Sequence, residues 1–541
     1  MEKTNVRELQ DVVIRFSGDS GDGMQLTGTL FSDTSALLGN GISTFPDYPA
    51  EIRAPQGTVA GVSGFQVHFG ARRVTNPGDY CDVLVAMNPA ALKANRKWLK
   101  PGATVIIDGD SITEDHLKKA CFATLDPIAE LKLDEYNVVI PGITTMTRDA
   151  LRETGLDNKS VTKCKNMFAL GICFYLFDRP EAYAFKYIET KFAKKNPAIA
   201  EANKLAIRAG YDYAANTHQF ANTYTVAPAP LEKGTYRSIS GNVATAWGLC
   251  AAAEKAGLPL FCGSYPITPA TVILEELAKR KDLGVKTVQA EDEIAGICTA
   301  IGAAFAGNFA VTTTSGPGLS LKSEALGLAV MTELPLVVVD VQRGGPSTGL
   351  PTKTEQSDLS QALYGRNGEC PVIVVAASSP SDCFHYAFEA GRLAMEHMTP
   401  VILLTDGFIA NGSEPWRIPA MKDYPAITPP IVDEAPEGGF MPYVRNENLA
   451  RGWAFPGKAG LEHRVGGLEK DCVKGCISHD PSNHQKMVRT RAEKVAKAVD
   501  DIPAQAVWGA PEGDLLVVGW GGTRGHLQNA VDQMRAEGKR V

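Results

Sequence analysis

The chain has 541 residues, more than one hydrophobic core usually holds, so two or three domains are expected. Hydrophobic residues make up 44% of the sequence and charged residues 21%, which is ordinary for a soluble globular enzyme. The formal net charge of −7 argues against nucleic acid as the main partner, because phosphate binding needs a basic face.

The hydropathy and the cysteine content predict a cytoplasmic protein. Residues 1–5 lack the apolar core of a signal peptide, and no window holds the roughly 18 apolar residues of a membrane span. Most of the eleven cysteines have apolar neighbours, which is typical of reduced core residues. Cys472 and Cys476 form the one close pair, but zinc and iron–sulfur sites need about four ligands. We therefore interpret them as loop thiols and predict no metal site.

Residues 1–215 alternate strand-like and helix-like runs, which predicts a mainly parallel sheet covered by helices. The predicted strands are 12–16, 82–87, 104–109 and 137–142. Residues from about 160 to 210 are predicted to be helical, with apolar residues on one face. The polar stretch 216–235 contains Ala-Pro-Ala-Pro, which is typical of an extended linker.

Residues 236–430 predict a second α/β domain, doubly wound around a parallel sheet. Its short apolar runs end in Gly, Ser, Thr or Asp, as buried parallel strands do. These runs are 258–262, 310–314, 336–341, 372–376 and 401–406.

The remainder of the chain predicts an excursion and a further α/β unit. Residues 431–500 are rich in Pro, Gly and charge and end in a basic helical stretch at 484–499. Residues 501–541 are expected to open another α/β unit, with a strand at 514–521 and a helix at 525–537. That unit is too short to bury a core alone, so we expect it to pack on a neighbour or to continue in a further piece.

The turn Tyr265-Pro266-Ile267-Thr268-Pro269 is stiffened by two prolines. A hydroxyl held between prolines is well placed to donate a hydrogen bond to a bound carboxylate. The alternative is a rigid strand-to-helix turn in which Thr268 caps the following helix. The residues alone leave both open.

Three carboxylates, Glu291, Asp292 and Glu293, open a helical run that then becomes small and apolar. The helix macrodipole favours acidic residues at a helix start, which accounts for one or two of them. The uncharged, apolar residues that follow predict a deeply buried helix. A carboxyl at the start of this helix is then expected to lie in an environment of low dielectric constant. Such a carboxyl can share a proton with a ring nitrogen.

Two further sequence motifs directly follow predicted strands. Ser315 and Gly316 follow the strand 310–314, and hydroxyls or backbone N–H groups there could face a ring or a phosphate. An ordinary strand-to-helix connection is the alternative. Arg343 follows the strand 336–341 at the sheet edge where α/β proteins bind ligands, and arginine binds carboxylates through paired hydrogen bonds. The alternative is a surface arginine in a flexible loop.

The N-terminal turn at 17–24 contains Gly-Asp-Ser-Gly-Asp-Gly after a strand. Such a turn can cradle phosphate at a helix N-terminus, but Asp19 and Asp22 would repel it, so it is weak evidence for a nucleotide. Farther on, residues 45–53 predict an ordered loop. Arg53 in it is a candidate contact for coenzyme A or substrate, although a packing salt bridge is favoured.

These strings resemble the 2-oxoacid:ferredoxin oxidoreductases, which use thiamine diphosphate. The shared strings are Tyr-Pro-Ile-Thr-Pro at 265–269, Thr-Thr-Thr-Ser-Gly-Pro-Gly at 312–318 and Gln-Arg-Gly-Gly-Pro-Ser-Thr-Gly at 342–349. The resemblance implies a gamma domain to about 215, a pyrimidine-binding alpha domain from about 236, and the start of a transketolase C-terminal-like domain at the tail. The close match is the fused gamma–alpha subunit of the 2-oxoglutarate type.

The resemblance also implies roles for residues. The family glutamate lies nine residues before the glycine of a Gly-Ala-x-x-Ala-Gly stretch, which selects Glu293; Glu291 requires a register slip of two. Glu293 then contacts the aminopyrimidine and promotes deprotonation of the thiazolium carbon. The implied substrate contacts are Thr268, Arg343, Thr352 and Lys353, and the implied cofactor contacts are Tyr265, Pro266, Ile267, Glu293, Ser315 and Gly316.

The sequence lacks two parts that the family places on a separate beta subunit. In the second domain we find no Gly-Asp-Gly followed by an Asn at the spacing that holds magnesium and diphosphate in thiamine enzymes, and the chain has no cysteine set for a [4Fe-4S] cluster. The chain is therefore expected to be half of an active site in an (alpha-beta)2 assembly, with coenzyme A and ferredoxin as co-substrates. A non-catalytic assembly subunit and a nicotinamide dehydrogenase built on the N-terminal glycine turn remain as alternatives.

Overall fold

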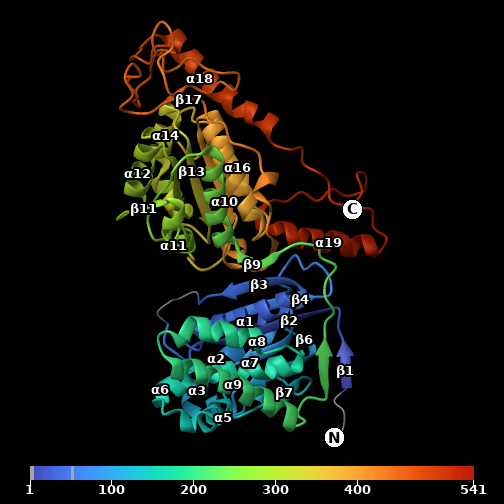
Figure 1. Ribbon diagram of the computed structural model, residues 1–541. Helices are drawn as coiled ribbons and strands as arrows, with labels where there is room; N and C mark the ends of the chain where they lie inside the picture. The colour runs from blue at the N-terminus through green and yellow to red at the C-terminus, as the bar shows by residue number, and fades with distance from the viewer. Residues whose placement is uncertain (1–4, 50–53) are drawn as a thin grey trace. The chain divides into compact units, whose positions relative to one another are not determined.

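The computed structural model describes residues 5–49 and 54–541, and the chain divides into two compact units (Figure 1). The first unit holds the chain up to Ser238 together with Ser413–Arg417, and the second holds Ile239–Gly412 and Ile418–Val541. Each unit has its own six-stranded sheet. The predicted α/β class is confirmed.

The sheet of the first unit has the strand order β3-β4-β2-β5-β6-β7. Its strands are β2 (Asp11–Asp19), β3 (Gly41–Asp47), β4 (Val62–Gly70), β5 (Cys81–Ala86), β6 (Leu99–Ile107) and β7 (Asn137–Val139). The four predicted strands are all present. β1 (Asn5–Glu8) and β8 (Asn222–Thr225) form a separate parallel pair, and β9 (Tyr236–Ser240) pairs with β16 (Ser413–Arg417).

The first sheet is mixed, because β3 and β4 add an antiparallel edge that was not predicted. Glycine and proline in these segments hide the strand signal, and their pairing depends on β2, which is distant in the sequence. The loop predicted at 45–53 is wrong in its first part, since residues 45–47 finish β3. Arg53 lies outside the described residues.

Helices cover both faces of this sheet. Val12, Ile14 and Phe16 of β2 point into one core, whereas Val13 points into the other, as the two-residue period of a strand requires. The helices of this unit are α1 (Met24–Leu37), α2 (Pro89–Asn95), α3 (Glu114–Lys119), α4 (Pro127–Glu130), α5 (Ile143–Ala150), α6 (Asn158–Thr162), α7 (Lys165–Leu176), α8 (Ala182–Ile188) and α9 (Pro197–Asn216). The predicted helical region from 160 to 210 is confirmed.

The second unit is built on an all-parallel sheet of order β11-β10-β12-β13-β15-β14. The strands are β10 (Leu260–Ser264), β11 (Lys286–Gln289), β12 (Phe309–Thr314), β13 (Leu336–Gln342), β14 (Ile373–Ala376) and β15 (Pro400–Asp406). The five predicted strands are confirmed. Sequence reasoning missed β11, a short polar strand at the sheet edge.

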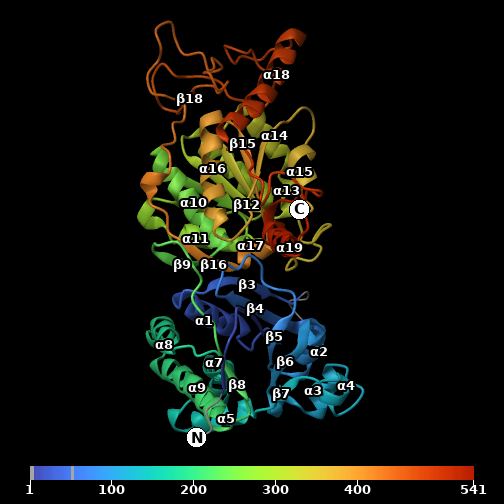
Figure 2. The same ribbon diagram turned by 90° about the vertical axis from the view of Figure 1, so that its right-hand side faces the viewer.

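Helices lie on both sides of this second sheet (Figure 2). α10 (Gly241–Ala256) packs on α16 (Asp382–His397) over one face. The other face carries α12 (Glu293–Phe305), α13 (Gly316–Leu321), α14 (Ser323–Thr332) and α15 (Leu359–Tyr364), which share one hydrophobic core. The sheet is therefore doubly wound, with α11 (Thr271–Ala278) and α17 (Gly407–Asn411) at its connections.

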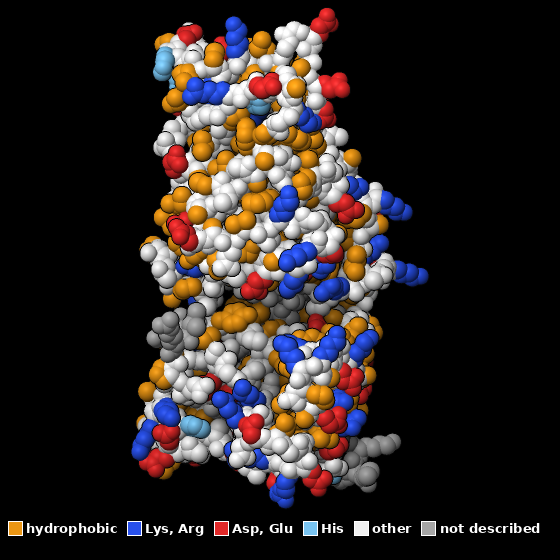
Figure 3. Space-filling view, turned by 60° about the vertical axis from the view of Figure 1, so that its left-hand side comes forward, with side chains coloured by type: hydrophobic (Ala, Val, Ile, Leu, Met, Phe, Trp, Pro, Cys, Tyr) orange, Lys and Arg blue, Asp and Glu red, His pale blue; other side chains and the backbone are white. Residues whose placement is uncertain are grey.

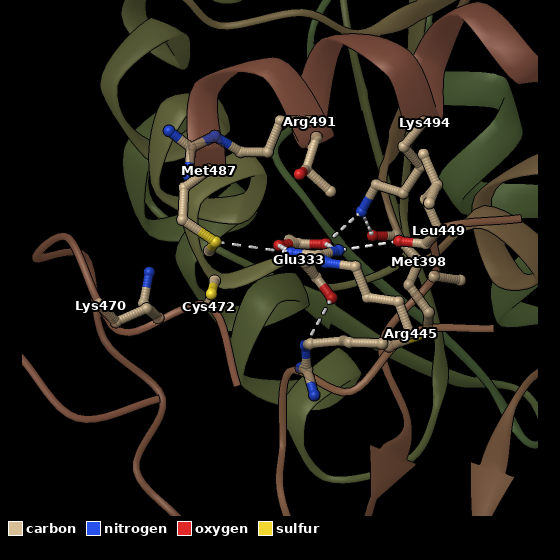
Figure 4. Close-up of polar contacts among 12 residues, drawn as sticks. Glu333, Met398, Arg445, Leu449, Lys470, Cys472, Met487, Arg491 and Lys494 are labelled. Atoms are coloured by element: carbon tan, nitrogen blue, oxygen red, sulfur yellow. Dashed lines mark hydrogen bonds and ion pairs between the residues drawn. The ribbon is translucent and has the colours of Figure 1, made fainter. Parts of the chain in front are cut away.

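A buried ion cluster attaches the excursion, residues 431–500, to the second unit (Figure 4). Glu333, which follows α14, accepts hydrogen bonds from Arg445 at 2.6 Å to each oxygen and from Lys494 at 2.5 Å. Lys470 and Arg451 donate to main-chain carbonyl oxygens at the C-terminal end of α14, where the helix dipole favours cations. The excursion thus caps α14 rather than forming a core.

The rest of the excursion contains little regular structure. β17 (Ile431–Val432) pairs with β18 (Trp453–Ala454), and α18 (Pro481–Lys497) confirms the predicted basic helix. Near the end of the chain, α19 (Arg524–Ala536) confirms the second predicted helix.

The strand predicted at 514–521 is not formed. Leu515, Leu516, Val517 and Val518 form no regular structure, and Val518 is 82% exposed. The N–H groups of Asp514 and Leu515 both donate to the Arg540 oxygen, but no strand among the described residues forms a ladder with this segment.

Candidate functional site

The predicted site residues gather at the carboxyl ends of three adjacent strands of the second unit, β10, β12 and β13. Tyr265 follows β10, Ser315 follows β12 and Arg343 follows β13. Because these strands are parallel neighbours, their carboxyl ends share one edge of the sheet, where α/β folds bind ligands.

The turn after β10 presents Thr268 at this edge. Tyr265 and Pro266 are half-buried, Ile267 is buried and Thr268 is exposed. The N-cap of α11 is Ala270, without a side-chain cap, so the capping alternative for Thr268 is wrong.

Arg343 is buried at 7% exposure and reaches this turn. Its guanidinium donates to the main-chain oxygen of Thr268 at 2.8 Å and to that of Thr348 at 3.2 Å. Its Nε is buried without a partner, and no carboxylate of the described residues forms an ion pair with it. Burial lowers the pKa of Arg343, while Glu293 and Tyr265 act in the opposite direction. The flexible surface arginine is therefore excluded, and a buried cation remains available to an anion.

Glu293 is the first residue of α12, and the Asp292 side chain caps the helix by accepting from the Ala295 N–H at 2.8 Å. Glu291 lies before the cap and is exposed. A methyl group built on Gly318 of α13 would lie 2.9 Å from Cγ of Glu293, so the Glu293 side chain packs on the glycine backbone there. The geometry favours Glu293 over Glu291 as the carboxyl at this edge.

The prediction that α12 is deeply buried is confirmed for one side of the helix and wrong for the other. Ile297 and Ala300 lie in the core, but Ile294 is 50% exposed and Cys298 is also exposed. The helix is apolar on every side, so its composition does not distinguish the core face from an apolar outer face. In Figure 3, which brings the α12 side of Figure 1 forward, charged side chains are sparse over much of the second unit.

Thr352 and Lys353 lie in the loop that follows Arg343. This loop folds back on itself, with Gly344 N–H donating to the Lys353 oxygen at 2.8 Å and Leu350 N–H to the Gly344 oxygen at 2.8 Å. Both side chains are half-buried. The backbone thus holds them near Arg343, while no described contact joins them to Glu293.

Ser315 and Gly316 form a strand-to-helix connection, with Ser315 at the N-cap of α13. The Ser315 hydroxyl makes no capping hydrogen bond and is buried without a hydrogen-bond partner. A methyl group built on Gly316 would lie 2.6 Å from Oδ2 of Asp358. Ser315 therefore keeps an unused hydroxyl close to the edge.

Sequence reasoning missed an acid pair beneath this connection. Asp340 on β13 is fully buried and pairs in register with Thr314. Burial and the neighbouring Asp358 carboxyl raise the pKa of Asp340 well above its usual range, and burial also raises the pKa of Asp358. Two neighbouring carboxyls in a buried place each disfavour the ionisation of the other. A signal was present, since an aspartate inside a run of valines is unusual in a buried strand.

Sequence reasoning also missed Lys322, which joins α13 to α14. Its side chain is fully buried, and its ammonium donates to the Glu293 main-chain oxygen at 2.7 Å and to Oγ1 of Thr312 at 3.2 Å. The only signal was a lone lysine between two apolar runs, which is more often exposed.

The N-terminal glycine turn uses its two carboxylates internally. Asp19 accepts from the Gly57 N–H at 3.0 and 3.1 Å, and Asp22 accepts from the Asp19 N–H and pairs with Lys165 at 3.0 Å. Burial raises the pKa of Asp19. These contacts hold the turn closed and assign it no ligand.

The described part of the chain contains no group of three or more His, Cys, Asp or Glu residues arranged for a metal ion. No disulfide joins any of the eleven cysteines, which all lie in the described part of the chain; Cys472 is half-buried and Cys476 is exposed. Within residues 5–49 and 54–541, no helix combines the length and the apolar character needed to cross a membrane.

Comparisons with known proteins find the same protein family in both units. Residues 13–213 match the family described as pyruvate ferredoxin/flavodoxin oxidoreductase, and residues 252–477 match its thiamine-diphosphate-binding region. The chain is 52% identical to the 2-oxoglutarate oxidoreductase subunit KorA of Mycobacterium tuberculosis, over 99% of this chain and 81% of that protein. It is 28% identical to a 2-oxoacid:ferredoxin oxidoreductase alpha subunit of Aeropyrum pernix, over 98% of this chain and 85% of the other.

A solved structure agrees in fold. The 2-oxoglutarate:ferredoxin oxidoreductase of Magnetococcus marinus, determined with 2-oxoglutarate, coenzyme A and succinyl-CoA bound, superposes with a TM-score of 0.83 at 33% identity. The match covers 98% of this chain and 87% of that one. The chain belongs to the 2-oxoacid:ferredoxin oxidoreductase family, as an alpha-type subunit.

Proposed function

We propose that this chain is the fused gamma–alpha subunit of a 2-oxoglutarate:ferredoxin oxidoreductase. The enzyme converts 2-oxoglutarate and coenzyme A to succinyl-CoA and CO2 and passes two electrons, one at a time, to ferredoxin, or it runs the reverse carboxylation. The observation that carries the proposal is the meeting of Glu293, Arg343 and Thr268 at one sheet edge. The 52% identity to a 2-oxoglutarate oxidoreductase subunit supports the choice of substrate.

The residues at this edge suit thiamine diphosphate. A carboxyl at a helix start, a glycine backbone at Gly318 and a buried unpartnered hydroxyl at Ser315 are what a flat aminopyrimidine needs. Tyr265, Pro266, Ile267 and Gly316 complete the proposed contacts. When bound, the cofactor supplies a carbon nucleophile and accepts the electrons left by decarboxylation.

The chain's own residues then have distinct tasks. Glu293 exchanges a proton with the ring nitrogen of the aminopyrimidine. Arg343 binds the carboxylate next to the 2-oxo group through its guanidinium, with the Thr268 hydroxyl as a second donor. Thr352 assists, and Lys353 binds the distal carboxylate of 2-oxoglutarate.

The remaining parts of the active site come from a beta subunit. We propose that it carries the Mg2+ and diphosphate site and a [4Fe-4S] cluster, in a cytoplasmic (alpha-beta)2 assembly. Within this chain, residues 1–215 are the gamma domain, 216–235 the linker and 236–430 the pyrimidine-binding domain. Residues 431–500 are the excursion, and 501–541 begin a transketolase C-terminal-like unit.

The test is a reconstituted complex with the beta subunit, assayed with 2-oxoacids, coenzyme A and a low-potential dye. We expect turnover of 2-oxoglutarate, and a loss of about 100- to 10,000-fold in Glu293→Gln. Glu291→Gln is the matched control and should stay close to wild type.

Other results lead to other assignments. A preference for pyruvate or branched-chain 2-oxoacids would keep the chemistry and replace the substrate. Equal turnover of Glu293→Gln and wild type would refute the catalytic role and leave a non-catalytic assembly subunit.

A further inference from the structure

Lys322 is a buried cation at the first residue of α12. It is 0% exposed, and its Nζ lies 2.7 Å from the Glu293 main-chain oxygen and 3.2 Å from Oγ1 of Thr312 on β12. No carboxylate of the described residues forms an ion pair with it. One side chain thereby ties the first residue of α12 to the central strand β12.

The position is unfavourable for a lysine that serves only packing. A buried ammonium without a paired carboxylate loses its hydration, and an apolar side chain of similar length would fill the same space at lower cost. Burial accordingly lowers the pKa of Lys322 to about 8. A charged group in such a place points to a role for the charge itself.

The groups that face the Lys322 ammonium identify the target of that charge. They are Glu293 and Cys298 of α12, its N-cap Asp292, and Cys262 of β10. Burial raises the pKa of the Cys262 thiol to about 12, so this thiol stays neutral. The attraction is therefore directed to the carboxylates at the head of α12, and Glu293 is its largest source.

We propose that Lys322 is a positioning residue for Glu293. Its ammonium fixes the main chain of Glu293 by donating a hydrogen bond to the carbonyl oxygen. Its positive charge attracts the Glu293 carboxylate, so that this carboxylate stays oriented toward the binding edge of the sheet. Arg343, which also attracts Glu293, lies on the substrate side. The inference rests on the proposed function, because it concerns the same carboxylate.

The experiment uses the reconstituted complex with two variants at position 322. Lys322→Met removes the charge and both hydrogen bonds, whereas Lys322→Arg keeps a charge over the whole accessible pH range. The control is Lys470→Met, which removes another fully enclosed lysine whose pKa burial lowers to about 8, far from Glu293 in the excursion. The readouts are kcat, KM for the 2-oxoacid, the kcat–pH profile and the thermal midpoint.

We expect Lys322→Met to lower kcat by about 10- to 100-fold with little change in KM. In wild type, kcat should fall as pH rises past about 8, where the Lys322 ammonium loses its proton. In Lys322→Arg, this decrease of kcat at alkaline pH, the basic limb of the profile, should shift to higher pH by one unit or more. Lys470→Met should leave kcat and the profile unchanged.

Three results would overturn the inference. They are a wild-type kcat in Lys322→Met, an unmoved basic limb in Lys322→Arg, and an equal loss of kcat in Lys470→Met. If Lys322→Met does not fold, the pH profile of Lys322→Arg decides alone. Failure of the proposed function has a different signature, since Glu293→Gln would then also be as active as wild type.

Discussion

Glu333 offers the sharpest test of how the excursion is held. We consider Glu333→Gln, which keeps the shape of the side chain and removes its charge. The backbone of Glu333 has a left-handed φ of 51°, and glutamine carries the same strain there, so the substitution isolates the charge.

The expected cost follows from the burial of the cluster. Glu333 is 1% exposed and balances Arg445 and Lys494, which both lie deep in the structure. Removing one partner of a buried ion pair costs about 3–5 kcal/mol, because the other charge stays behind uncompensated. At about 1.4 kcal/mol per tenfold, local opening of the excursion should rise roughly 100- to 4000-fold.

The assay is hydrogen–deuterium exchange of the peptides that cover residues 440–497, at neutral pH. Asp433→Asn is the control, because Asp433 is an exposed carboxylate of the excursion, its partner Lys458 is also partly exposed, and the loss of such a pair should cost at most about 1 kcal/mol. Exchange in Glu333→Gln within about threefold of wild type, or slower than in Asp433→Asn, would refute the reasoning.

The pH dependence supplies a second check of the same argument. Lys494 and Arg445 hold the pKa of Glu333 far below its usual value, although burial acts in the opposite direction. A carboxyl whose folded pKa is depressed stabilises the fold above its unfolded pKa and loses that contribution as pH falls. The difference between Glu333→Gln and wild type should therefore be full at pH 7 and shrink below about pH 4.5.

Three further predictions concern backbone contacts and the acid pair. Gly210→Ala would place a methyl carbon 1.9 Å from a carbonyl oxygen of α7, so thermal unfolding should show a loss of about 1–3 kcal/mol or more. Gly318→Ala would place a methyl carbon 2.1 Å from Oγ1 of Thr314 and 2.9 Å from Cγ of Glu293; the resulting displacement of Glu293 should lower kcat about 100-fold in the reconstituted complex, whereas Gly327→Ala, which meets nothing within 4 Å, should not. Because the folded pKa of Asp340 is raised, wild type loses stability as pH rises above about 4, so Asp340→Asn should gain up to about 1.4 kcal/mol per pH unit in urea titrations, and a constant difference across pH would contradict this.

Local patterns in the sequence predicted most of the architecture. Apolar runs that end in small polar residues located five of the six strands of the second unit, because a buried parallel strand must be apolar along its length. The same rule placed Thr268, Ser315 and Arg343 just after the carboxyl ends of three strands, and the structure showed that these strands are neighbours. The antiparallel edge formed by β3 and β4 was not predicted, since glycine and proline interrupt both segments and β4 joins the sheet by pairing with β2, which is distant in the chain.

What the sequence by itself determined is thus the class of fold, the order of its elements and the residues that end its strands, because each depends on a few neighbouring residues. The tertiary structure alone decided that Arg343 turns to the Thr268 carbonyl, that Lys322 lies beneath Glu293 and that one side of α12 stays exposed. It also decided that residues 514–521 find no strand to pair with. These outcomes depend on which surfaces pack together in the folded protein. Side chains of the same type are therefore buried at one position and exposed at another.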